Sequence, residues 1–217
     1  MRVSEKTLEL NFCTQFSEHV RSRHILWFGP TQRQEAQWGF DASSKLGGQL
    51  IIFQFKAAKK RVGEGLWRFR VQHRQLCALQ RLHQEHVGER LSIFYGFPLI
   101  VSAQAFQQHP ELLPQTGLLD VQTLPAISPP RRKDGTSNRN GEHAVEVRIE
   151  EPQHPKAYVA SIKQHFSLRC AEDLVDEIRT ANGEQPRDFG KAPPQAVLNE
   201  GSGQMHLPLG GVGVLLW

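Results

Sequence analysis

The sequence predicts a mixed α/β (α+β) fold whose core is a helix, three strands, a second helix and a fourth strand. Apolar residues recur every four positions near the N-terminus, a period that is typical of an amphipathic helix. Several shorter runs alternate apolar and polar residues, or are rich in β-branched and aromatic residues, as strands are. In chain order these patterns give an αβββαβ arrangement within residues 4–98.

The first helix is predicted over residues 5–23. Ser4 can cap it, and its apolar stripe is expected to pack on a sheet. The stripe consists of Leu8, Phe12, Phe16 and Val20. Residues 24–37 contain glycine, proline and many polar side chains, so they are interpreted as a loop that follows a short strand at residues 25–28.

The next two elements form a predicted hairpin. Strand-like runs at residues 38–45 and 49–57 flank Gly47-Gly48, and glycine adopts the positive φ of a two-residue primed turn without strain. Such a loop fixes the register of the whole hairpin. The predicted pairs include Leu46 with Gln49, Ala42 with Phe53, and Asp41 with Gln54.

This register brings three polar side chains together in otherwise apolar strands. Directly paired residues have Cβ atoms about 4.5 to 5.5 Å apart, so Asp41 and Gln54 can reach one metal ion. Lys56 lies two residues beyond Gln54, and its expected partner Gly39 leaves room beside it. The opposite face is predicted to enter the core through Phe40, Ile51, Phe53 and Phe55.

An unpaired charge buried in such strands costs several kcal/mol, so this arrangement needs a compensating interaction. Two explanations stay open at this point. Asp41 and Lys56 can form a salt bridge at the end of the sheet. Alternatively, Asp41 and Gln54 ligate a hard divalent cation through oxygen, while Lys56 handles the attacking water or the charge of a phosphate.

The predicted core ends with a strand at residues 66–71, a helix at 72–86 and a buried strand at 90–98. Residues 1–121 are assigned to this core. A linker rich in Pro, Gly, Ser and Asn is predicted at residues 122–143, and a C-terminal extension of unassigned role at 144–217. Within the extension we predict strands at 144–150 and 157–162 and a helix at 171–179.

Composition narrows the class of protein. The chain has 217 residues and a formal net charge of +4, and no apolar run is long enough to cross a bilayer. The opening residues contain no apolar segment typical of a signal peptide. The three cysteines match no metal-binding spacing, so we expect reduced thiols and a cytoplasmic protein without a membrane partner.

Taken together, the "GFD" and "QFK" segments resemble the site of the PD-(D/E)XK, or restriction-endonuclease-like, nuclease superfamily. Members of that superfamily have an αβββαβ core, with a central mixed sheet flanked by helices. They carry an Asp at the end of one core strand, an (E/Q)-x-Lys triplet on the next strand and often a Glu on the first helix. The resemblance covers residues 4–98 and assigns these roles to Asp41, Gln54 and Lys56.

The resemblance leaves the remaining acid of the site open. Gln54 stands where many members have an acid, as in QxK variants, and an amide oxygen can ligate Mg²⁺ without adding charge. Glu9, beside the apolar stripe of the first helix, suits the helix carboxylate, although a solvated helix face explains it equally well. Glu35, six residues before Asp41, competes with it, whereas the helix dipole already explains Glu5.

The resemblance implies hydrolysis of phosphodiester bonds in DNA with Mg²⁺ or Mn²⁺, in a restriction or anti-phage setting. A basic segment next to the hairpin would then hold the nucleic-acid backbone. Its residues are Lys59, Lys60, Arg61, Arg68, Arg70 and Arg74. The alternatives are an inactive nuclease-fold module that binds nucleic acid or a partner protein within a larger complex, and an enzyme of another class whose pocket lies in residues 100–217. The partners expected beside DNA are a second copy of the chain or another subunit of a defence complex.

Other polar features are assigned no role. His83 and His86 are interpreted as a solvent-facing pair, Gln75 as an ordinary polar helix residue, and the basic segment 129–135 as a soluble loop. The glycines of residues 209–214 are not followed by enough chain to form the helix of a dinucleotide-binding site.

Overall fold

The computed structural model divides the chain into two units, Met1–Pro186 and Arg187–Trp217. All described residues belong to the first unit. They are residues 1–20, 25–46, 48–63, 65–86, 90–132, 134–150 and 154–181. The predicted end of the first helix at residues 21–23, Gly47 and the glycine-rich segment 209–214 lie outside them.

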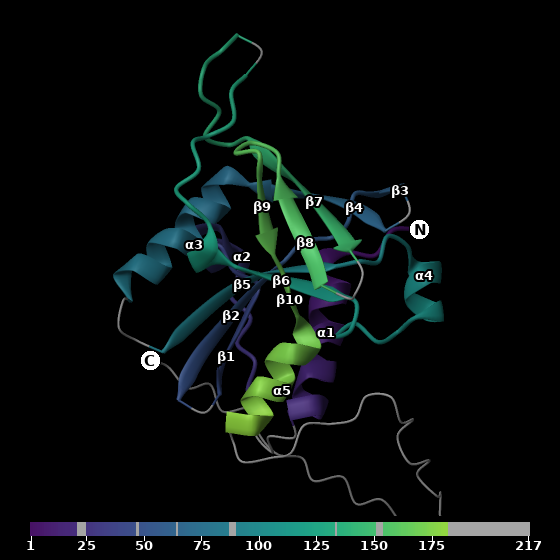
Figure 1. Cartoon of the computed structure of the whole chain (residues 1–217). Coiled ribbons are helices and arrows are strands. Elements are labelled where there is room, and N and C mark those ends of the chain that lie inside the picture. The colour runs from purple at the N-terminus through teal and green to yellow at the C-terminus, as the bar shows by residue number, and fades with distance from the viewer. Residues whose placement is uncertain are drawn as a thin grey trace, which may run out of the picture. The chain divides into compact units, whose positions relative to one another are not determined.

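Two five-stranded sheets form the fold, which confirms the mixed α/β class (Figure 1). The first sheet is mixed, because β2 pairs with β5 in parallel and its other pairs are antiparallel. Its order is β1 (Ala42–Leu46), β2 (Gln49–Phe55), β5 (Leu91–Pro98), β6 (Thr116–Asp120) and β10 (Arg169–Cys170). The second, antiparallel sheet has the order β3 (Lys60–Gly63), β4 (Leu66–Gln72), β7 (Glu142–Glu150), β8 (His154–Val159) and β9 (Gln164–Ser167).

Helices cover both faces of the first sheet. On one face, α1 (Glu5–Val20) and α5 (Ala171–Ala181) lie side by side and bury a cluster rich in phenylalanine (Figure 1). The other face packs on α3 (His73–Glu85) and on the second sheet. Two short elements, α4 (Ala103–Gln108) and the 3₁₀ helix η1 (Val121–Thr123), lie in the connections around β6.

Most elements of the predicted core are confirmed. Ser4 caps α1 by accepting a hydrogen bond from the backbone N–H of Thr7 at 3.0 Å. The hairpin has the predicted register, with Leu46 opposite Gln49 and Ala42 opposite Phe53. The strands and helices predicted beyond residue 66 correspond to β4, α3, β5, β7 and α5, whereas the strand predicted at 157–162 overlaps only the end of β8 and residues 160–162 form a turn.

The prediction of a loop at residues 24–37 and a strand from residue 38 is wrong. Gln32–Trp38 form a helix, α2, whose N-terminus has a capping box between Thr31 and Gln34. The helix ends at Gly39, and β1 begins only at Ala42. Of the short strand predicted at residues 25–28, only an isolated bridge from Phe28 to Ser43 is present.

Two side-chain placements in the hairpin differ from the prediction for the same reason. Because α2 ends at Gly39, this glycine packs against α3 instead of facing Lys56. Phe40 joins the cluster of Ile52 and α3, on the face opposite Phe53. The chain between α2 and β1 is therefore not extended strand, and the alternation counted from Ala42 does not reach Phe40.

The third predicted core strand, β4, lies in the second sheet, where it pairs with β3 and β7. The central sheet thus contains only two of the three consecutive strands expected of a restriction-endonuclease-like core. Residues 142–181 contribute strands to both sheets and place α5 beside α1. The segment predicted as a linker at 122–143 lies within one unit, because the chain before it and the chain after it each contribute strands to both sheets.

No helix in the part of the chain that the structure describes is long and apolar enough to span a membrane.

Gly39 is required by its conformation and by its surroundings. Its φ is +80°, and a Cβ atom there would lie 3.1 Å from the backbone oxygen of Gln75 and 3.3 Å from Cβ of Ala78. Gly48 has nearly the same φ, +79°, but apart from its chain neighbours no atom of the described residues lies within 4 Å of the place that its Cβ would take. Substitution of Gly48 therefore tests backbone strain alone, whereas substitution of Gly39 also tests crowding against α3.

We expect Gly48→Ala to lower the free energy of unfolding by about 1 kcal/mol, because only the left-handed conformation is strained. Gly39→Ala should lower it by about 2 to 4 kcal/mol, because the methyl group also crowds the packed helix. Urea denaturation of both variants measures the difference. Equal losses would show that the packing of α2 on α3 does not depend on the glycine.

Candidate active site

Asp41 lies between α2 and β1, where its carboxylate extends the hydrogen-bonded ladder of the hairpin. Its backbone N–H donates to the carbonyl of Phe53 at 3.0 Å. Its side-chain Oδ2 accepts the backbone N–H of Phe55 at 2.7 Å, at the end of β2. The carboxylate thus satisfies a strand N–H that no backbone carbonyl of β1 reaches, and these bonds hold it at the end of the sheet.

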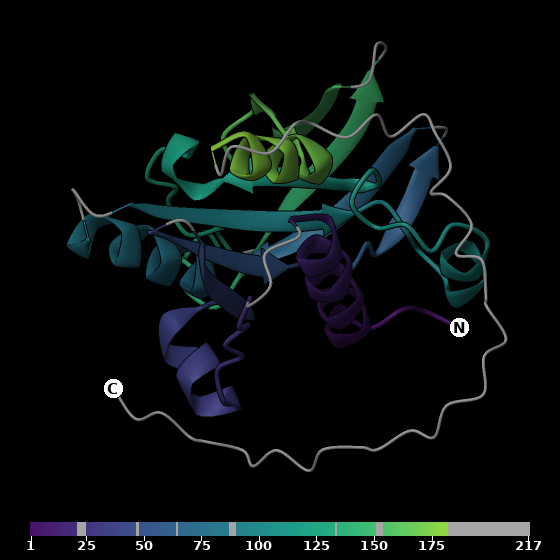
Figure 2. The same cartoon turned by 90° about the horizontal axis from the view of Figure 1, so that it is seen from below.

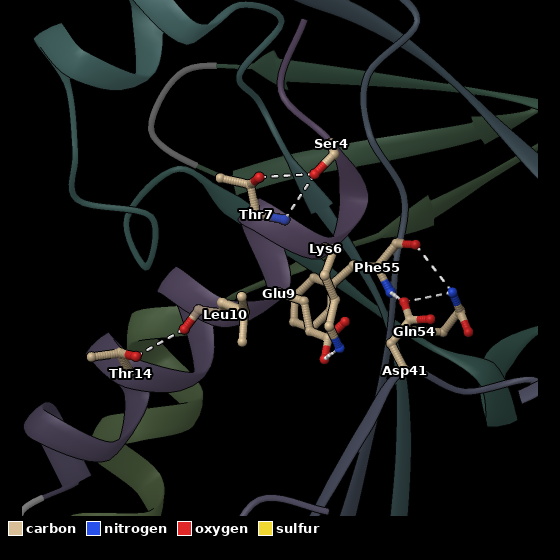
Figure 3. A network of polar contacts seen from close by, with 9 residues as sticks. All are labelled: Ser4, Lys6, Thr7, Glu9, Leu10, Thr14, Asp41, Gln54 and Phe55. Atoms are coloured by element: carbon tan, nitrogen blue, oxygen red, sulfur yellow. Dashed lines mark hydrogen bonds and ion pairs between the residues drawn. The ribbon is translucent and has the colours of Figure 1, made fainter. Parts of the chain in front are cut away.

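Gln54 contacts Asp41 directly, as the predicted register requires. Its Nε2 donates to Oδ2 of Asp41 at 2.7 Å and to the carbonyl of Phe55 at 3.1 Å (Figure 3). The side chain is fully buried, and its Oε1 has no hydrogen-bond partner among the described residues. The neighbouring residue on β5, Tyr95, is also fully buried, and its hydroxyl is unpaired within the same described ranges.

Unpaired oxygens on two fully buried side chains of neighbouring strands are unusual, because buried polar atoms are nearly always hydrogen-bonded. Nothing in the sequence singles out Tyr95 beyond its position in an apolar strand. The structure places it opposite Gln54 in the parallel pair of β2 and β5. This part of the sheet therefore offers oxygen atoms that a water molecule or a cation would satisfy.

Lys56 follows directly after β2 and is only 6% exposed. Its Nζ lies 3.5 Å from Oε2 of Glu5, whose other oxygen accepts the backbone N–H of Ala57 at 3.2 Å. The charge of Lys56 still acts on Asp41 and lowers the pKa of that carboxyl. The sequence alone explains Glu5 by the helix dipole, whereas the structure shows it as the ion-pair partner of Lys56.

Glu9 and Lys6 approach Asp41 from α1, on the side opposite Gln54 (Figure 3). Glu9 is 7% exposed, and its Oε1 accepts a hydrogen bond from Nζ of Lys6 at 2.6 Å. The other predicted acid, Glu35, lies on α2. Both acids add to the raised pKa of Asp41 through their charge, whereas Gln54 is the predicted site residue that contacts the carboxyl directly.

Burial is the main reason that the pKa of Asp41 rises from 3.8 to about 7, and the negative charges of Glu35 and Glu9 add to it. The hydrogen bond from Phe55 and the charge of Lys56 act in the opposite direction. A cation beside Asp41 would favour the ionised carboxylate. The site therefore binds a proton near neutral pH that a metal ion would displace.

The donor chemistry fits Mg²⁺ or Mn²⁺, which prefer carboxylate and amide oxygens. Asp41 supplies a carboxylate whose two hydrogen bonds both go to Oδ2, and Gln54 supplies a buried unpaired amide oxygen. Gln54, however, turns its nitrogen toward Asp41. Within the described residues no three His, Cys, Asp or Glu side chains form a group that could hold a metal ion.

The predicted basic segment is divided between the second sheet, where Lys60 on β3 lies opposite Arg68 on β4, and α3, which carries Arg74. Arg68 forms an ion pair with Glu146, and Arg70 pairs with Glu142 at 2.8 Å, both across the pair of β4 and β7. Arg61 lies over the ring of Trp67, with its guanidinium 5.6 Å from the ring centroid. Lys59 and Lys60 are exposed at the start of β3, and Arg74 lies on α3.

No protein-family model matches the chain, and no curated protein matches its sequence significantly.

The raised pKa of Asp41 predicts how stability depends on pH. Between about pH 4 and pH 7 the folded chain retains a proton that the unfolded chain has lost, so the contribution of this carboxyl to the free energy of unfolding falls as pH rises. Asp41→Asn removes this dependence. We expect the stability of the wild type relative to Asp41→Asn to fall by about 1 to 4 kcal/mol across this window and then to level off.

Urea denaturation at a series of pH values tests this expectation. Asp134→Asn is the control, because hydrogen bonds from Thr136 lower the pKa of the exposed Asp134 and it should titrate below the window. A wild type whose stability relative to Asp41→Asn stays constant from pH 4 to pH 8 would contradict the assignment of a buried, proton-binding Asp41.

Proposed function

We propose that the chain is a metal-dependent nuclease that hydrolyses phosphodiester bonds of DNA. One observation carries this proposal: the carboxylate of Asp41 and the side chain of Gln54 meet at 2.7 Å at the end of the hairpin, where the charge of the buried Lys56 acts on Asp41. A carboxylate, an amide and an ammonium at this spacing are the groups that the (D)…(E/Q)-x-Lys pattern of PD-(D/E)XK nucleases supplies.

In this proposal Asp41, Gln54 and Glu9 hold Mg²⁺ or Mn²⁺, with Glu35 as the alternative acid. The bound ion would polarise the phosphate and lower the pKa of its water. Lys56 orients the attacking water or neutralises charge that develops at the phosphate. Glu5 positions Lys56, because the carboxylate of Glu5 accepts hydrogen bonds from Nζ of Lys56 and from the backbone N–H of Ala57.

A second candidate function is a nuclease-fold module without catalysis, which binds nucleic acid or a partner protein within a larger complex. The orientation of Gln54 favours it, because the amide nitrogen rather than the oxygen faces Asp41. To ligate the same ion as Asp41, the carboxamide would have to turn and lose its two hydrogen bonds. A defence setting, for the nuclease or for the module, rests on the resemblance alone.

Cleavage of plasmid and oligonucleotide DNA with Mg²⁺, Mn²⁺ or EDTA separates the two functions. We expect cleavage that EDTA abolishes and that Asp41→Ala and Lys56→Ala each reduce by at least about 10²-fold. The rate at low Mg²⁺ should also rise with pH through about 7, as the carboxyl of Asp41 ionises.

Lys45→Ala, an exposed change on β1, is the matched control and should retain wild-type cleavage. Circular dichroism confirms that each variant is folded. Binding without cleavage in the wild type supports the non-catalytic module, and cleavage that survives both site substitutions contradicts the proposed site.

A further inference from the structure

A basic groove lies apart from the hairpin, between α2, α3 and the loop that joins η1 to β7. Its volume is about 1010 Å³. Its walls carry four arginines, which are Arg33 on α2, Arg74 and Arg81 on α3, and Arg139 on the loop. The two helices are neighbours in Figures 1 and 2, consistent with the close approach of Gly39 to α3.

The loop wall of the groove is fixed to α3 and to the second sheet. The backbone N–H of His73, the first residue of α3, donates to the carbonyl of Gly141 at 2.9 Å. The ring of His73 contacts that of His143 on β7, with 3.0 Å between Nδ1 and Nε2. The loop also closes on itself through the N–H of Asn138, which donates to the carbonyl of Pro130 at 2.7 Å.

The charge of the groove is not balanced by acids. Among the described residues that line it, none is acidic. Arg81 has a long ion pair with Glu85 at 3.6 Å. Arg33, Arg74 and Arg139 are exposed and form no ion pair within the described ranges of the chain. This contrasts with Arg68 and Arg70, whose charges are paired across the second sheet.

The arrangement of these arginines suits a row of phosphates. Arg74 and Arg81 are seven residues apart on α3, which corresponds to a rise of about 10 Å, or about three times the axial rise of 3.4 Å per phosphate of one strand in duplex DNA. Arginine binds phosphate through two parallel N–H groups, and Gln37, Ser137 and Asn140 add neutral hydrogen-bonding groups. Among the described residues that line the groove, the apolar side chains are Ala78 and Pro129, not the large aromatic anchors typical of protein interfaces.

We propose that this groove binds the phosphodiester backbone of a nucleic acid through Arg33, Arg74, Arg81 and Arg139. The biological meaning of this inference rests on the proposed function. The groove and the site are linked by α2, which carries the groove residue Arg33 and the candidate site residue Glu35 and ends at Trp38, shortly before Asp41. A strand held in the groove would run beside the segment that positions Asp41. The binding itself needs no metal and no cleavage.

Cys77 supplies a reporter inside the groove. Its thiol is exposed on α3 between Arg74 and Arg81, and Sγ lies 3.5 Å from Nε2 of His73. Cys13 is buried and Cys170 is only partly exposed. A strand bound along the groove should therefore shield Cys77 from an alkylating reagent without a comparable effect at the other two cysteines.

The test measures binding of the full chain to fluorescein-labelled single-stranded and duplex DNA of about 20 nucleotides, in EDTA and over a range of salt concentrations. The groove variant is Arg33→Gln/Arg74→Gln/Arg139→Gln. The comparison variant, Arg61→Gln/Arg68→Gln/Arg70→Gln, removes the same number and type of charges from the second sheet. Circular dichroism and thermal unfolding establish that both variants are folded.

We expect the groove variant to lose ~10²-fold in affinity at 0.1 M salt and to reduce the slope of log K against log salt by about 2 to 3. The comparison variant should bind within a few-fold of the wild type. The oligonucleotide should slow alkylation of Cys77 by iodoacetamide, whereas equal concentrations of inorganic phosphate or of a free nucleotide should not.

Several results would overturn the proposal: equal losses in the two variants, unchanged binding in the groove variant, or a wild type that does not bind DNA at low salt. Protection by inorganic phosphate alone would assign the groove to a small anion, and equal competition by poly-glutamate would assign it to an acidic protein. Because the binding assay contains EDTA, its result does not depend on cleavage. A chain that binds DNA in this assay but does not cleave it with Mg²⁺ or Mn²⁺ would support the groove and contradict only the proposed nuclease activity.

Discussion

The carboxylate of Asp41 is the constraint on which the site depends. Its Oδ2 accepts two hydrogen bonds of 2.7 Å, from the backbone of Phe55 and the side chain of Gln54, so it joins the strand end to the amide. Burial and the charges of Glu35 and Glu9 together raise the pKa of this carboxyl to about 7, while Lys56 opposes them. The fold thus places the carboxyl of Asp41 where the positive charge of Lys56 only partly offsets burial and the negative charges of Glu35 and Glu9.

The hairpin could be predicted because its information is local. A Gly-Gly turn fixes which residues pair, and the resulting contact between Asp41 and Gln54 is present in the structure. The signals of α2 are also local, namely Thr31, Gln34 and Gly39, but they stand among glycine, proline and polar residues that are equally typical of a loop. The loop predicted there displaced the start of β1 and the face assigned to Phe40.

Long-range pairing could not be predicted in the same way. Nothing in the run at residues 66–72 specifies that β4 pairs with β7, some 75 residues later, rather than with β2. This pairing offsets the charges of Arg68 and Arg70, because β7 presents Glu146 and Glu142 to them. The basic groove is likewise invisible in sequence, since its arginines come from α2, α3 and a loop that meet only in the folded chain.

The central claim is that Asp41 and its neighbours form a cation site that exchanges a proton for a metal ion. Calorimetric titration of the full chain with Mn²⁺ and Mg²⁺ near pH 7, in buffers of different ionisation enthalpy, tests it most directly. The account predicts saturable binding with release of up to about one proton, both lost in Asp41→Asn. Absence of binding, or binding that Asp41→Asn leaves unchanged, would contradict it.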